Sequence, residues 1–217
     1  MSETKSSNRL HTILASEIAL GILIVLLAIS AATTSYLSAM SDSDQTKYNV
    51  WASQKLATAN ADYLTVNQQI GMDYNNYDSF YLNQDKPDLS EYYTFNFSEE
   101  LTAAVERSKA DTSDNADPFD DKYYETLSAD YELSFKEAKE LFALAEKFNT
   151  RGDDYQLIVL IASMGLAFAA FAALLSDGSK LRLVLAILSI GLFIYVVVLW
   201  LQIPMAGPTL SMVIRPD

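Results

Sequence analysis

The sequence predicts an all-α membrane protein: three transmembrane helices, with an extramembrane antiparallel helical hairpin or bundle inserted between spans one and two. Three observations predict this fold: three long apolar runs, a strongly acidic middle segment, and apolar residues at helical spacing within that segment. A membrane-spanning helix needs about 20 residues to cross roughly 30 Å of hydrocarbon. All three apolar runs reach this length.

The apolar runs occupy residues 13–37, 155–175 and 183–203. The first contains one acidic residue, Glu17, and the other two contain no charge. Inside lipid, a single segment satisfies the hydrogen bonds of its own backbone only as a helix, so each run is predicted to be a span. A cleaved signal peptide is the alternative for the first run, which is long for the apolar part of such a leader. We therefore expect an uncleaved anchor.

Short basic flanks predict the orientation of the chain. Residues 1–12 and the tight loop 176–182 each carry two basic residues, which places both in the cytoplasm under the positive-inside rule. The segment 38–154 and the tail 204–217 then lie outside the plasma membrane. Three aromatic residues fall at the proposed outer boundary, as an aromatic belt would: Tyr36, Tyr155 and Trp200.

The middle of the chain carries most of its charge. Residues 41–154 hold 24 of the 28 acidic and 10 of the 15 basic residues, which gives this segment a net charge of −14 and the rest of the chain +1. A surface this acidic repels phosphate backbones and anionic lipid headgroups. We therefore expect no nucleic-acid partner, and we expect the lipid bilayer as the partner of the three spans.

Two long helices joined by an irregular tip are predicted for the middle segment. The first has a seam of Ala52, Leu56, Ala59, Tyr63, Val66, Ile70, Tyr74, Tyr77 and Tyr81, and the second has a seam of Tyr124, Leu127, Tyr131, Ala138, Leu141, Ala145 and Phe148. Their period near 3.5 is typical of a coiled coil. The second helix is expected to begin with Asp117 as its cap and Pro118 at its first position, and a short helix near 98–110 lies between the two.

Aromatic residues gather at the tip, interleaved with acids. We interpret them as a contact surface for a partner protein or a glycan, because tyrosines supply rigid amphipathic contact area. The alternative is that these rings fill the tip's own small core. The set is Tyr74, Tyr77, Phe80, Tyr81, Tyr92, Tyr93, Phe95 and Phe97.

Two features of the spans invite a functional interpretation. Glu17 lies about one turn inside the first run, and an acid within a span is a hypothesis for proton or ion coupling. The alternative is that it reaches headgroups or pairs with a nearby basic residue. In span two, Gly165, Ala169 and Ala173 form a small-xxx-small ridge, which predicts close helix packing within the chain or against another subunit.

Catalytic and metal-binding patterns are missing from the sequence. There is no Cys and one His, which excludes disulfides, thiol catalysis and multi-histidine metal sites. The acidic loop 111–121 fails as an EF-hand, because Ala116 stands where Gly is needed and Lys122 where the bidentate Glu belongs. We expect no enzyme activity, no cofactor and no metal.

The stretch 50–69, VWASQKLATANADYLTVNQQ and chiefly its WASQK, carries a resemblance to a family. It resembles a poorly characterised bacterial group of small three-span membrane proteins of unknown function. Members have an N-terminal anchor, a Gln- and Ala-rich helical insert outside the cytoplasm and two closely spaced C-terminal spans. The resemblance implies this layout but no activity and no functional residues.

Three functions compete on the sequence alone. The leading one is a non-enzymatic scaffold or accessory subunit, which forms a homo-oligomer or binds a membrane-protein partner. The second is a helical sensory module that signals through a separate partner, since the cytoplasmic segments are short. The third is an oligomeric pore or transporter subunit lined by small and hydroxyl side chains such as Ser163 and Ser189.

Overall fold

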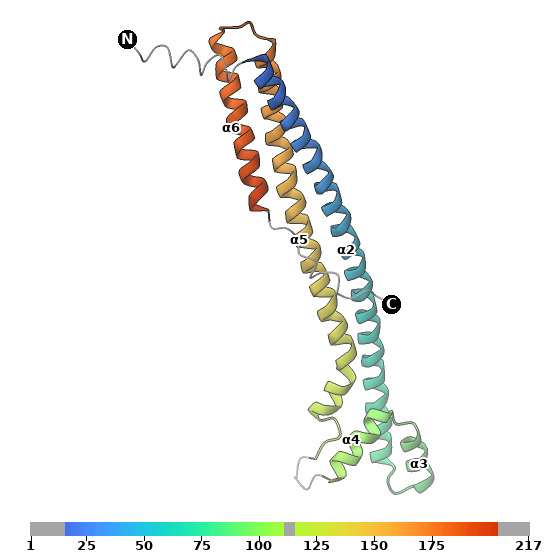
Figure 1. The fold of residues 1–217 in the computed structure, drawn as a ribbon. Coiled ribbons are helices and arrows are strands. Elements are labelled where there is room, and N and C mark those ends of the chain that lie inside the picture. The colour runs from blue at the N-terminus through green and yellow to red at the C-terminus, as the bar shows by residue number, and fades with distance from the viewer. Residues whose placement is uncertain (1–15, 111–115, 204–217) are drawn as a thin grey trace. The chain divides into compact units, whose positions relative to one another are not determined.

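The computed structural model describes residues 16–110 and 116–203, and every element in these ranges is a helix (Figure 1). The expectations for residues 1–12 and for the tail 204–217 lie outside the described residues. The all-α prediction is confirmed, and α2, α5 and α6 are each long and apolar enough to cross a membrane. In order, the helices are α2 (Glu17–Leu82), α3 (Pro87–Phe95), α4 (Glu99–Ala110), α5 (Asp121–Leu174) and α6 (Lys180–Gln202).

The chain folds as two compact units. Within the described residues, the first unit runs up to Tyr48 and resumes at Leu144, and the second unit is Asn49–Ala143. Helices α2 and α5 contribute to both units, α6 belongs to the first, and α3 and α4 belong to the second.

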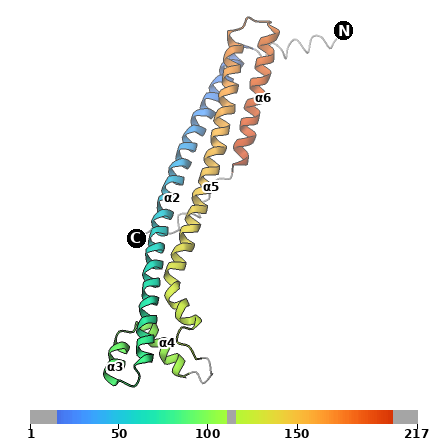
Figure 2. The ribbon, with the colours of Figure 1, turned by 180° about the vertical axis from the view of Figure 1, so that it is seen from behind.

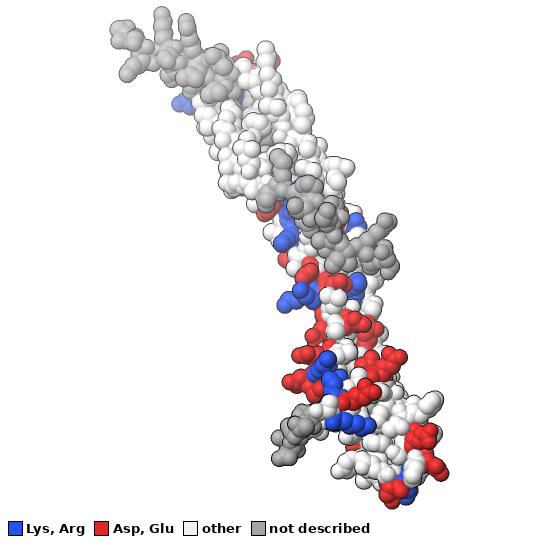
Figure 3. All heavy atoms as spheres, turned by 60° about the horizontal axis from the view of Figure 1, so that its bottom comes forward, with Lys and Arg blue, Asp and Glu red and all other residues white. Residues whose placement is uncertain are grey.

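The first unit packs segments of α2, α5 and α6 side by side, as both ribbon views show (Figures 1 and 2). On the face drawn in Figure 3, the surface of these apolar segments is almost free of charged side chains, as lipid contact requires. The buried core consists of Leu23 and Leu27 of α2, Ile158, Ile161, Ala162 and Ala169 of α5, and Val196 of α6.

Gly165 is a point of close approach between the three helices of the first unit. A Cβ at this position would lie 3.2 Å from Leu27 Cδ2 and 3.4 Å from Leu192 Cβ. The Ser189 hydroxyl donates a 2.8 Å hydrogen bond to the Gly165 carbonyl oxygen. The missing side chain therefore lets α2 and α6 close on α5, as small residues do between membrane helices.

Small and polar side chains continue the contact between α2 and α5 in this unit. Ser38 is buried and its hydroxyl donates to the Gly152 carbonyl oxygen at 3.2 Å. Further along, the Tyr48 and Phe148 rings stack with centroids 5.4 Å apart. Tyr155, predicted for an aromatic belt, is instead buried, and its hydroxyl accepts hydrogen bonds from Arg151. The belt prediction is wrong for Tyr155, because its position on α5 faces the helix contact and not the outside of the unit.

A tight turn connects α5 to α6. Gly178 has φ of +85°, a backbone conformation that glycine adopts without strain. Arg182 is buried, donates to the Leu175 carbonyl oxygen at 2.8 Å, and forms an ion pair with Asp177 at 2.6 Å. It thus satisfies a carbonyl group at the end of α5.

In the second unit, the α2 and α5 segments run in opposite directions. The Lys55 ammonium lies 2.9 Å from a Glu137 carboxylate oxygen, and the Tyr63 and Tyr131 rings meet edge to face at 5.4 Å. Nearer the end of α2, the hydroxyl of Tyr74 hydrogen-bonds that of Tyr124. The residue numbers of the α5 partners therefore decrease as those of the α2 partners increase, as they do between antiparallel helices.

Helix α4 closes the core of the second unit. The buried cluster is Leu101, Ala104, Val105 and Tyr123, with Ile70, Tyr77, Phe97, Phe119 and Leu127 packed against it. The predicted seam placed Tyr124 inside, and this is wrong: Tyr123 is buried and Tyr124 is exposed. The first turn of α5 packs against α4 as well as α2, and this third helix selects Tyr123.

Two local predictions for the second unit also need correction. The tip is not wholly irregular, because Pro87–Phe95 forms α3, with Pro87 at a first-turn position that suits proline. Helix α5 begins at Asp121, not near Asp117. Its cap is Asp120, which accepts a 2.8 Å hydrogen bond from the Tyr123 N–H, whereas Asp117 accepts one from Phe119 and forms a turn before the helix.

Candidate interaction surface and its supporting network

A buried carboxylate organises the second unit. Asp73 of α2 is fully buried and accepts four hydrogen bonds from groups that lie apart in the sequence. The donors are Gln69 Nε2 at 3.0 Å, the Ser98 N–H at 3.3 Å, the Ser98 hydroxyl at 2.6 Å and the Tyr123 hydroxyl at 2.8 Å. A buried charge is tolerated when its acceptor sites are filled in this way.

Ser98 has two roles in this network. Its hydroxyl donates to Asp73 and accepts a 3.0 Å hydrogen bond from the Leu101 N–H, so it also caps α4. The cap therefore fixes α4 to α2 through a single side chain. Sequence reasoning missed Asp73, although its spacing from Ile70 and Tyr77 puts an acid inside the apolar seam of α2.

The tyrosines beside Asp73 have altered acidity. Burial, together with the hydrogen bond to Asp73, raises the pKa of the Tyr123 hydroxyl far above its usual range. Partial desolvation, together with the hydrogen bond with Tyr74, raises the pKa of the exposed Tyr124 to about 12. Both hydroxyls therefore stay protonated as hydrogen-bond donors across the physiological range.

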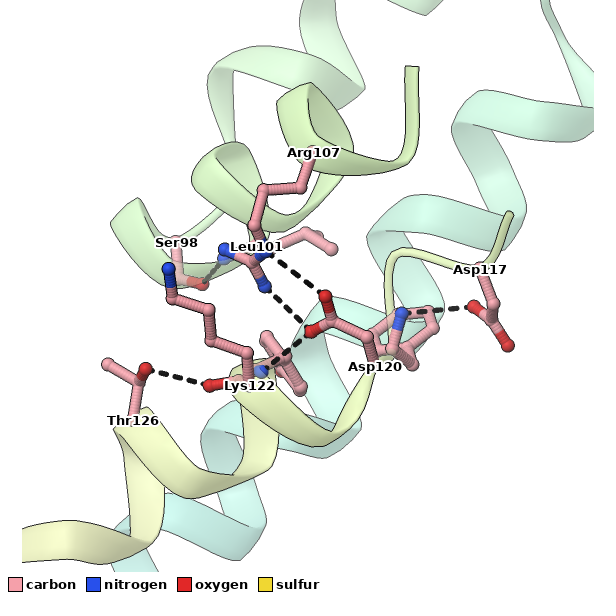
Figure 4. A network of polar contacts seen from close by, with 9 residues as sticks. Ser98, Leu101, Arg107, Asp117, Asp120, Lys122 and Thr126 are labelled. Carbon is pink, nitrogen blue, oxygen red and sulfur yellow. Dashed lines mark hydrogen bonds and ion pairs between the residues drawn. The ribbon is translucent and has the colours of Figure 1, made fainter. Parts of the chain in front are cut away.

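An ion pair joins α4 to the start of α5 (Figure 4). Arg107 donates through Nε at 3.0 Å and Nη2 at 2.7 Å to the two carboxylate oxygens of Asp120. The hydrogen bond to Arg107 lowers the pKa of Asp120, against a smaller opposing effect of burial. Asp120 thus holds α4 with one carboxylate while it caps α5.

Part of the predicted aromatic set forms the core of the tip. The Phe97 ring lies 6.3 Å from that of Tyr77 and 5.7 Å from that of Phe80. Phe119, which was not predicted, stacks on Tyr74 at 4.0 Å and meets Tyr77 edge to face at 5.5 Å. Tyr77, Phe80 and Phe97 are half-buried and pack within the unit, whereas Tyr74 is exposed and contacts the unit through the Phe119 ring.

The rest of the predicted set lies on the outside. Phe95 is 88% exposed, and no residue of α3 is buried. Tyr93 is half-buried, with its ring 5.5 Å from that of Tyr92. We call the exposed apolar side chains of α3 and the end of α2 the aromatic surface: Tyr81 (64% exposed), Leu82 (76%), Leu89 (42%), Tyr92 (62%) and Phe95.

A polar groove lies between α2 and the end of α3, with a volume of about 560 Å³. One wall is formed by Gln69, Met72, Asn75 and Asn76 of α2. The other wall is formed by Tyr92, Tyr93, Asn96, Phe97 and Ser98. We call it the carboxamide groove, because four of its nine lining residues are Asn or Gln.

The predicted features of the spans lie in the first unit. Gly165 and Ala169 are buried at helix contacts, Ala173 is exposed, and Ala172 occupies the buried place on that turn. Glu17 is the exposed first residue of α2, where the positive helix end favours a carboxylate. Ser163 is exposed and bonds back to the Val159 carbonyl oxygen, whereas Ser189 is buried against Gly165.

Comparison with known proteins finds no matching family model, no matching curated protein and no matching solved structure. The resemblance of residues 50–69 to a group of three-span proteins therefore stays a prediction. Within residues 16–110 and 116–203, no three His, Cys, Asp or Glu side chains form a group that could hold a metal ion.

Proposed function

We propose that this protein is a non-enzymatic integral membrane scaffold or accessory subunit, and that its second unit binds a partner protein outside the cytoplasm. The observation that carries the proposal is the exposure of α3. This helix buries none of its residues in the chain and presents Tyr92 and Phe95 to solvent.

The exposure of α3 has a physical consequence. A helix of nine residues is too short to be stable by its own backbone hydrogen bonds, and packing normally supplies the difference. Exposed aromatic side chains that gather on one element mark interaction sites, and burial of Tyr or Phe dominates the energy of many interfaces. Seating a partner on the aromatic surface would bury this apolar area and stabilise α3.

The membrane placement follows from the apolar segments and the basic turn. Lys180 and Arg182 lie in the first turn of α6, next to the α5–α6 connection, which the positive-inside rule assigns to the cytoplasm. Asp177 beside Arg182 does not weaken this argument, because acidic residues contribute little to the rule. The protein then lies in the plasma membrane, and its second unit forms a helical hairpin outside the cytoplasm.

Site-specific photo-crosslinking in cells of the source organism tests the proposal. A benzoylphenylalanine at Phe95 or Tyr92 is expected to give a discrete adduct, identified by mass spectrometry. The matched control is Leu133 of α5, which is 55% exposed in the same unit but lies outside the aromatic surface. An adduct of twice the 24.1 kDa chain mass would identify a second copy, and any other mass a different partner.

Equal labelling at Phe95 and Leu133, or no adduct at either α3 position, would contradict the proposal. The absence of an adduct would mean that no partner protein lies on the aromatic surface, and equal labelling would mean that contacts there are no more specific than elsewhere on the second unit.

A sensory module is the second candidate, favoured by the continuity of two helices. Helix α2 is continuous from Glu17 to Leu82, and α5 from Asp121 to Leu174, so each runs from an apolar segment into the second unit. A sensor of this kind needs a cytoplasmic partner for its output. The same photo-crosslinker at Ser176, exposed in the α5–α6 turn, distinguishes the two functions: an adduct there supports sensing.

A further inference from the structure

The carboxamide groove has the lining of a ligand site for an uncharged polar molecule. Its volume of about 560 Å³ is within the range of small-ligand sites. Its nine lining residues include four carboxamides and two tyrosines, but no acidic or basic side chain. A phosphate or carboxylate ligand would find no counter-charge here.

Two of the groove carboxamides are held in a fixed orientation. Asn76 Nδ2 donates a 2.9 Å hydrogen bond to the Asn96 carbonyl oxygen, and Asn96 Nδ2 donates a 2.7 Å hydrogen bond to the Tyr92 carbonyl oxygen. Each amide nitrogen is thereby engaged with the backbone. Within the described residues, the side-chain oxygens of Asn76 and Asn96 accept no hydrogen bond, so both are free to accept one from a ligand.

Other groove atoms are also unused. Asn75 and the hydroxyls of Tyr92 and Tyr93 make no hydrogen bond to the part of the chain that the structure describes, and Asn75 and Tyr92 are exposed. A carboxamide offers a donor and an acceptor on one planar group, and a tyrosine offers a hydroxyl on an apolar ring. The groove therefore presents acceptors, donors and ring faces together.

We infer that the carboxamide groove binds a neutral oligosaccharide. Sugar hydroxyls donate and accept hydrogen bonds at once, which matches the carboxamides, and the C–H face of a sugar ring matches the exposed face of Tyr92. An anionic glycan is disfavoured, because residues 49–143 contain 19 acidic and 7 basic residues, a net charge of −12. This goes beyond the proposed function, which concerns a protein partner on the aromatic surface.

Binding of defined saccharides to the purified full chain tests the inference. The chain is reconstituted in nanodiscs, because many mild detergents carry sugar headgroups that would compete. The probes are maltohexaose, cellohexaose and chitohexaose, titrated separately and followed by saturation-transfer NMR. Trigalacturonate serves as the anionic comparison ligand and hexaglycine as the peptide comparison ligand. Saturable binding of at least one neutral hexasaccharide is expected, without binding of trigalacturonate.

Three variants locate the binding. Asn75→Ala removes the whole carboxamide and is expected to weaken binding about fivefold, as loss of one ligand hydrogen bond of about 1 kcal/mol does. Tyr92→Ala removes a ring face and a hydroxyl and is expected to weaken it tenfold or more. Asn67→Ala is the matched control, since Asn67 is an exposed carboxamide on the same helix outside the groove, and it should leave affinity unchanged.

Three outcomes would overturn the inference: no binding of any neutral probe at about 1 mM, a concentration that reveals weak sites; equal binding by the wild type, Asn75→Ala and Tyr92→Ala chains; or binding of hexaglycine alone. The assay needs no partner protein. Saccharide binding without a photo-crosslink at Phe95 would therefore reject only the proposed function. A photo-crosslink at Phe95 without saccharide binding would reject only this inference.

Discussion

At the residue scale, Asp73 connects three helices of the second unit. It binds Ser98 at the cap of α4 and Tyr123 in the first turn of α5, from its own place on α2. Hydrogen bonds to a buried charge contribute about 1.5–3 kcal/mol each, and removal of one partner leaves the others unsatisfied. The positions of the aromatic surface and the groove both depend on the hydrogen bonds of Asp73, because Ser98 ends the short connection that follows α3.

Substitution of this carboxylate gives the first prediction. Asp73→Ala is expected to destabilise the second unit by about 3 kcal/mol, because the buried Tyr123 hydroxyl loses its acceptor. Opening of the α4–α5 junction should then unfold the first turn of α5 around Lys122, whose side chain is already exposed, and tryptic cleavage there should accelerate about 100-fold in the purified full chain. The control is Asp78→Ala, an exposed acid on the same helix. Equal cleavage rates for the two variants would show that the network does not hold the junction.

The raised pKa values of Tyr123 and Tyr124 predict a loss of stability at high pH. In the unfolded chain a tyrosine ionises near pH 10, whereas the folded-state pKa of Tyr124 is about 12 and that of Tyr123 is also raised. The unfolded state therefore binds fewer protons in this window, and the stabilisation present below pH 10 is lost as the pH rises toward 12. Thermal melts of the full chain across this range should show the fall.

A variant tests whether Tyr124 contributes to this loss of stability. Tyr124→Phe should flatten the decrease in melting temperature above pH 10, because phenylalanine has no proton to lose. Tyr92→Phe is the control, since its hydroxyl makes no hydrogen bond to the described residues. An unchanged slope in Tyr124→Phe would mean that other groups cause the loss.

At the scale of the elements, helix contacts in the first unit depend on the absence of side chains. Gly165 brings Leu27 of α2 and Leu192 of α6 within van der Waals range of α5. Membrane helices gain little from the hydrophobic effect between one another, so close packing of this kind carries much of their association. The interhelical bond from Ser189 adds a polar contact at the same point.

A pair of glycine variants tests this close approach. Gly165→Leu forces a branched side chain into atoms about 3.2 Å away and should destabilise the unit by about 1–3 kcal/mol, as overpacking does. Gly191→Leu is the matched control, because a Cβ there meets nothing within 4 Å. Melting temperatures from circular dichroism should fall for Gly165→Leu alone. A similar fall for both variants would mean that glycine flexibility, not close packing, is what matters.

At the scale of the whole molecule, the absence of cysteine allows a direct test of topology. We expect Gln84→Cys in the second unit to react with a membrane-impermeant maleimide on intact cells. Ser176→Cys in the α5–α6 turn should react only after permeabilisation, because the positive-inside rule places that turn in the cytoplasm. The reverse labelling pattern would invert the proposed orientation and place the aromatic surface inside the cell.

The sequence by itself determined the helical class and the spanning segments, because both depend on local composition and spacing. Runs of about 20 apolar residues and a seam of period 3.5 are visible without any knowledge of the fold. The start of α4 at Ser98 is also visible in the local sequence, because a capping side chain hydrogen-bonds within the first turn of its own helix.

Only the tertiary structure decided which side chains are inside. It placed Tyr123 and not Tyr124 in the core, divided the aromatic set between the core and the aromatic surface, and buried Asp73. The reason is separation along the chain: Asp73 meets a residue 25 positions away and another 50 positions away. Helical periodicity fixes which residues share a face, whereas burial depends on which other helix covers that face, and a single sequence pattern does not contain that information.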